Sequence, residues 1–146
     1  MESPLDTRAT AQFFTDISER FEAILLGFST FRDRLQAVGE TNPYFKWQVS
    51  GLTENRRSFE VRYLDLTVRA VLSVQPHIDL LGVITFYRLD DFDPLQISKV
   101  DSVEFDAETG RTGIKHTAGT DLYINVPQHA AGLLTAVLQT AYVARG

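Results

Sequence analysis

His116, Asp121 and His129, in the last third of the chain, are the side chains whose types suit joint chemistry. Two imidazoles and a carboxylate can bind a divalent metal ion, or act as a general base with an acid that orients it. His129 is expected in the first turn of a helix, where the helix dipole favours the neutral imidazole that both roles need. The spacing matches no established metal-site pattern. We therefore keep these three residues and Arg88 as candidate ligand-binding residues, and we predict no metal and no cofactor.

Other sequence signals of an enzyme are missing. The acidic loop formed by Asp90, Asp91 and Asp93 lacks the glycine and the distal glutamate of a calcium-binding loop, so we predict a solvated turn. The chain has no glycine-rich phosphate loop, no nucleophile elbow and no HExxH motif. It also has no cysteine, which excludes thiolate catalysis and disulfide bonds. These absences favour a binding protein over an enzyme.

The size and charge of the chain limit its partners. With 146 residues, of which 44% are apolar, the chain can bury one core, and we predict a single domain. The net charge of −5 does not suit phosphate binding, so no nucleic-acid partner is expected. The sequence does not open with a basic segment followed by an apolar one, and no apolar run is long enough to span a bilayer. We therefore predict a cytoplasmic protein with no membrane partner.

A long amphipathic helix is the element around which the rest of the chain must be arranged. Between residues 13 and 38, apolar residues recur at alternating spacings of three and four, which is typical of one helix face. The members of this face are Phe14, Ile17, Phe21, Ile24, Phe28, Phe31, Leu35 and Val38. Gly39 is expected to end the helix in a left-handed conformation, and Pro43 prevents its resumption.

This helix face can pack on the protein's own sheet or against a second chain. Its heptad spacing suits a coiled coil, but the flanking positions hold Arg20 and Arg34 without acidic partners. Gly27 in the middle of the helix costs roughly 1 kcal/mol relative to alanine. We therefore favour packing on the sheet, with a helix-mediated dimer as the alternative. Leu25 and Leu26 widen the apolar face and are candidate interface residues.

After Pro43 the apolar spacing changes from helical to alternating, which predicts strands. The first strand is expected at residues 44–52. The alternation slips at Leu64 and Asp65, where we predict a bulge or a tight turn. Residues 80–89 are apolar on both faces, which indicates a central strand covered on both sides. Gly110 is expected at a positive-φ position of a hairpin turn.

A closing helix is predicted over residues 128–144, with Pro127 at its start. It carries no charge from Ala130 to Ala144, and so wide an apolar surface needs cover on most sides. Its narrow polar stripe comprises Gln128, Gly132, Thr135, Gln139 and Tyr142. The helix either lies between the sheet and the first helix, or forms a subunit interface with Gln139 and Tyr142 at its centre.

Together these patterns predict an α+β fold. An antiparallel meander of about five or six strands (44–126) is covered by a long N-terminal helix (1–39) and a C-terminal helix (128–144). We predict a small non-enzymatic binding domain that joins a protein partner, or its own copy as a homodimer, through apolar helix surface. One alternative is a small-molecule-binding protein or enzyme with a pocket between sheet and helices. The aromatic walls of that pocket would be Phe59, Tyr63, Phe86, Tyr87 and Trp47. The other alternative is a small acidic chaperone or immunity-type protein.

Overall fold

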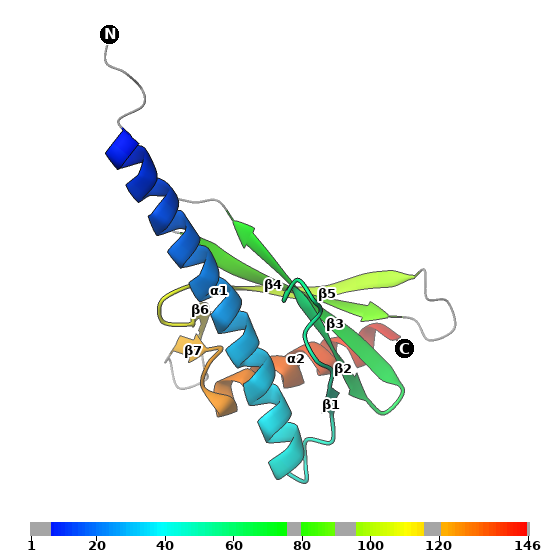
Figure 1. The fold of residues 1–146 in the computed structure, drawn as a ribbon. Coiled ribbons are helices and arrows are strands. Elements are labelled where there is room, and N and C mark those ends of the chain that lie inside the picture. The colour runs from blue at the N-terminus through cyan, green and yellow to red at the C-terminus, as the bar shows by residue number, and fades with distance from the viewer. Residues whose placement is uncertain (1–6, 76–79, 90–95, 116–120, 146) are drawn as a thin grey trace.

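Seven antiparallel strands pair in the order in which they occur along the chain. The structure is a computed structural model, and it describes residues 7–75, 80–89, 96–115 and 121–145. The strands are β1 (Gln48–Val49), β2 (Ser58–Tyr63), β3 (Leu66–Gln75), β4 (Leu81–Leu89), β5 (Ile97–Asp106), β6 (Arg111–Lys115) and β7 (Asp121–Tyr123). The helices are α1 (Thr7–Thr41) and α2 (Pro127–Arg145). The sheet is curled into a half-barrel (Figure 1). The predicted α+β meander is confirmed, with seven strands in place of five or six.

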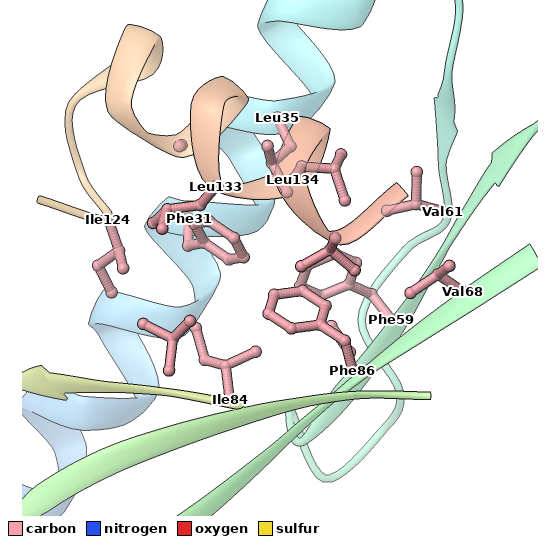
Figure 2. Packing of buried hydrophobic residues seen from close by; sticks show 14 of the residues in the cluster. Phe31, Leu35, Phe59, Val61, Val68, Ile84, Phe86, Ile124, Leu133 and Leu134 are labelled. Atoms are coloured by element: carbon pink, nitrogen blue, oxygen red, sulfur yellow. The ribbon is translucent and has the colours of Figure 1, made fainter. Parts of the chain in front are cut away.

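One hydrophobic core joins both helices to the same face of the sheet. Phe31 of α1 is fully buried, with its ring 6.1 Å from that of Phe59 on β2 and 6.4 Å from that of Phe86 on β4. Leu134 of α2 enters the same cluster (Figure 2). The helix face from Ile24 onward therefore packs on the protein's own sheet, as the sequence favoured.

The first part of α1 is not covered in this way. Residues 7–19, which we call the arm, project beyond the sheet and α2 (Figure 1). Phe13 and Phe14 of the arm are 59% and 63% exposed. Phe21, just beyond the arm, is the first residue of the heptad face that packs against the core. The guanidinium of Arg57 lies 5.2 Å from the centre of the Phe21 ring. Among the described residues, the core therefore uses the heptad face from Phe21 onward.

Two details of the strands agree with the sequence and one agrees only in part. Tyr63 pairs with Leu66, and Leu64 has φ of 56°, so the slip in alternation is a tight turn. Gly110 has the expected positive φ, 76°. β4 is central, but both helices lie on the face that carries Phe86, and its other face is outside the core cluster, with Tyr87 partly exposed. In the described part of the chain the helices therefore cover β4 on one side only, although Val83 on its other side is just 8% exposed.

Two glycines let a phenylalanine lie between α1 and the sheet. Gly82 of β4 pairs with Phe105 of β5, and a Cβ atom added at Gly82 would lie 2.3 Å from the Cζ atom of the Phe105 ring. A Cβ atom at Gly27 of α1 would lie 3.1 Å from another atom of the same ring. Gly27 thus allows α1 to approach the ring closely, which accounts for a glycine in the middle of a long helix.

Candidate functional site

A groove runs along the outer side of α2, between this helix and residues 42–47, which follow α1. It consists of two adjoining hollows of about 440 and 550 Å³ that share Phe45, Thr135 and Gln139. One wall is aromatic: Tyr44, Phe45, Trp47, Tyr63 and Tyr142. The floor carries the polar stripe of α2: Gln128, Gly132, Thr135 and Gln139. None of the residues that line the two hollows is charged. We call this feature the α2 groove.

Hydrogen bonds at the end of α1 fix the aromatic wall. The side-chain oxygen of Asn42 accepts a bond from the backbone N–H of Tyr44 at 2.9 Å, and its carbonyl accepts one from Phe45 at 3.2 Å. These bonds make a turn of the kind that asparagine favours. The indole N–H of Trp47 donates to the carbonyl of Leu35 at 2.8 Å. Trp47 is buried, and its ring centre lies 4.8 Å from that of Phe45. The wall is therefore anchored on the body of α1.

Gly39 makes room for Trp47. The expectation that Gly39 ends the helix is wrong, because α1 continues to Thr41 and the N–H of Asn42 still bonds to the carbonyl of Val38 at 2.9 Å. A Cβ atom at Gly39 would lie 2.8 Å from both Cδ1 and the backbone oxygen of Trp47. The glycine is thus a site of close approach between helix and groove wall, and not a helix cap.

We expect Gly39→Ala to lower the free energy of unfolding by about 1–2 kcal/mol, although alanine is the better helix former by about 1 kcal/mol. The added methyl must displace Trp47, so the emission spectrum of this tryptophan, the only one in the chain, should shift as well. Urea denaturation and fluorescence measure both effects. A more stable variant with an unchanged spectrum would contradict the packing role of Gly39.

The C-terminal end of α2 is tied to the sheet beside the groove. The hydroxyl of Tyr142 donates to a carboxylate oxygen of Asp65 at 3.3 Å, and its ring meets the ring of Tyr63 edge-on with centres 6.2 Å apart. Arg88 donates to the carbonyl of Ala141 at 3.2 Å. A cation at the last carbonyl groups of a helix is favourable to the helix dipole. Arg88, a candidate for ligand binding, thus has a structural contact to α2.

The four candidate interface residues lie in three different places. Gln139 and Tyr142 both line the α2 groove. Leu26 is 67% exposed and borders a separate hollow next to the turn between β5 and β6. Leu25 is only 3% exposed and belongs to the core. The expectation that Leu25 faces outward with Leu26 is therefore corrected, because its side chain packs inside the protein.

The histidine and aspartate candidates have structural partners where they are described. Nδ1 of His129 accepts the backbone N–H of Tyr123 at 3.1 Å, and the two rings stack with centres 6.1 Å apart. Asp121 forms an ion pair with Arg111 at 2.5 Å. His116 and the acidic loop of Asp90, Asp91 and Asp93 lie outside the described residues. Within the described part of the chain, no group of three histidine or acidic side chains could hold a metal ion.

The aromatic residues expected to wall a pocket between sheet and helices are divided by the fold. Phe59 and Phe86 are 1% exposed, and their rings pack against α1 as part of the core. Tyr87 lies on the opposite face of β4. Trp47 and Tyr63 line the α2 groove. The hollow that Trp47 and Tyr63 line therefore lies between α2 and residues 42–47, and not between the sheet and the helices.

Comparisons of the chain with protein-family models, with curated proteins and with solved structures found no match. Neither helix, over the residues described, combines the length and the apolar character that crossing a membrane requires.

Proposed function

We propose that the protein is a binding module whose α2 groove takes up an amphipathic helical segment of a protein partner. The observation that carries this proposal is an elongated groove with an aromatic wall and no charged lining residue. Its lining residues extend along α2 from Pro127 to Val143, a length of roughly 24 Å at 1.5 Å per residue. An amphipathic helix can lay its apolar face into a groove of this kind, with side-chain anchors at positions i, i+3 or i+4, and i+7.

The rim and the floor of the groove support the same proposal. Tyr44 and Val143 are 87% and 81% exposed, so the rim offers apolar surface that a partner can cover. Gln139 is exposed on the floor, and its amide can donate and accept hydrogen bonds. Tyrosine and tryptophan are enriched among residues that dominate binding energy. A groove with two connected hollows suits an elongated segment better than a compact small molecule, which is usually enclosed.

A phage-displayed library of amphipathic helices tests this proposal, with the protein immobilised as the target. We expect the selected peptides to share apolar anchors at helical spacing and few charges on the anchor face. We also expect Gln139→Arg to weaken their binding about tenfold or more, because it places an unpaired charge in an uncharged groove. Fluorescence of Trp47 and titration calorimetry measure the affinity.

Thr140→Arg is the matched control, because Thr140 is the exposed next residue on α2 and does not line the groove. It should leave peptide binding within about twofold of the original. Failure to select any helix, or selection of helices that bind the Gln139→Arg variant equally well, would contradict the proposal.

A further inference from the structure

The arm of α1 is a helix with an apolar face that nothing in the described part of the chain covers. Its two phenylalanine rings lie edge-on with centres 5.4 Å apart, and both are more than half exposed. Ile17 is only partly covered and does not belong to the core cluster. Most of the stability of a helix in a protein comes from packing of its apolar face, which the described residues do not give the arm. A partner that covers this face would therefore stabilise the arm.

The middle of the arm resembles the lining of the α2 groove in carrying no charge. Residues 9–15 of the arm, Ala-Thr-Ala-Gln-Phe-Phe-Thr, carry no charge. The lining of the groove carries none either. Docking residues 9–15 into the groove would bury no ionised side chain, with Arg8, Asp16 and Glu19 of the arm left outside the contact. A more highly charged helix would not have this advantage.

The two surfaces lie at opposite ends of one helix. Phe14 is in the arm, while Val38, near the other end of α1, lines the groove. The two positions are about 36 Å apart along the helix. In a two-fold dimer with antiparallel α1 helices, the arm of each copy runs toward the groove of the other. The same contact then forms twice, as closed two-fold symmetry requires.

The area available is sufficient for such a dimer. A phenylalanine side chain buries about 150–250 Å², so the exposed parts of Phe13 and Phe14 offer roughly 240 Å² per arm. The groove loses a similar area, and the contact occurs twice. The total is about 1,000 Å² before any neighbouring residues are counted, which is near the lower limit for a specific interface.

We infer that the α2 groove is occupied by the arm of a second copy of this chain, in a reciprocal two-fold dimer. This inference rests on the proposed function, because the groove must be able to bind an apolar helix. The inference goes beyond the proposed function by naming the helix that the groove binds. Any other protein segment that uses the groove must then compete with the arm.

Sedimentation of the full chain over a concentration series tests the dimer. We expect a dimer that dissociates on dilution, and we expect Phe14→Glu to weaken the association about tenfold or more, since it carries a charge into the groove. Thr15→Glu, which adds the same charge at the exposed neighbouring position, should weaken it much less. A chain that stays monomeric over the series, or a Phe14→Glu variant that associates like the original, would overturn the inference.

Cysteine pairs test which surfaces meet, because the chain has no cysteine of its own. Chains with Ala11→Cys on the arm are mixed with chains that carry a cysteine at Gln139 in the groove, or at Thr140 outside it, and are then oxidised. We expect mixed disulfides with Gln139→Cys to form faster than with Thr140→Cys. Equal rates would overturn the inference. If selected peptides still bind the groove when the two rates are equal, the proposed function survives and only the dimer inference is overturned.

Discussion

Replacing Phe31 by alanine is expected to lower the free energy of unfolding by about 3–5 kcal/mol. Phe31 is fully buried where α1, α2 and the sheet meet (Figure 2). Its ring contacts Phe59 on β2 and Phe86 on β4, which belong to two non-adjacent strands. Three separate elements hold the site in shape, so the surrounding side chains cannot fill the cavity that the deletion leaves. Chemical denaturation measures the loss as a lower midpoint at unchanged slope.

Phe14→Ala provides the matched control on the same helix. Its ring is 63% exposed, so its loss should change the free energy of unfolding by about 0.5 kcal/mol or less at concentrations too low for association. Equal effects at Phe14 and Phe31 would mean that the arm and the C-terminal part of α1 are equally packed, which contradicts the fold described above.

Gly82→Ala is expected to destabilise the protein by about 1–3 kcal/mol. The new methyl group would lie 2.3 Å from the end of the Phe105 ring, which is 1% exposed. The ring cannot retreat far, because a Cβ atom built at Gly27 of α1 would already lie 3.1 Å from it. The sheet and the helix must therefore separate slightly, or the ring must leave its preferred rotamer.

Two further variants separate this steric effect from a general effect of alanine for glycine. Gly113 lies on β6 with open space where its Cβ atom would be, so Gly113→Ala should be neutral or slightly stabilising. Phe105→Leu removes the end of the ring, so Gly82→Ala should cost less in that background than in the original chain. Double-mutant analysis by urea denaturation measures the coupling. Independent, additive effects would contradict the contact.

The buried face of α1 and the turn at Leu64 could be predicted from the sequence because both follow from local periodicity. The spacing from Ile24 to Leu35 identified the buried face of α1, and the slip at Leu64 predicted a bulge or a tight turn, of which the structure has the turn. Both features are determined by neighbouring residues along one helix or one hairpin. For this part of α1, the sequence also correctly favoured packing on the protein's own sheet over packing against a second chain. The reason was that Arg20 and Arg34 do not suit a charge-paired coiled coil.

The α2 groove could not be predicted, because it depends on where distant segments cross. The polar stripe of α2 correctly grouped Thr135 and Gln139 on one face, but periodicity does not show what lies opposite that face. Trp47 was expected in a strand and in the aromatic wall of a pocket between sheet and helices, whereas the structure places it beside Gly39 in the wall of the α2 groove. A glycine near the end of a helix is equally compatible with a cap and with close tertiary approach. Only the path of residues 42–47 distinguishes the two.

The lengths of the outermost strands have a consequence for how copies of this protein can meet. The sheet ends in β1, which has two residues, and in β7, which has three. Strands this short present few free backbone N–H and C=O groups to another chain, so strand pairing between molecules at β1 or β7 is disfavoured. At these two strands, contact between copies is therefore expected through helix surface and not through strand pairing.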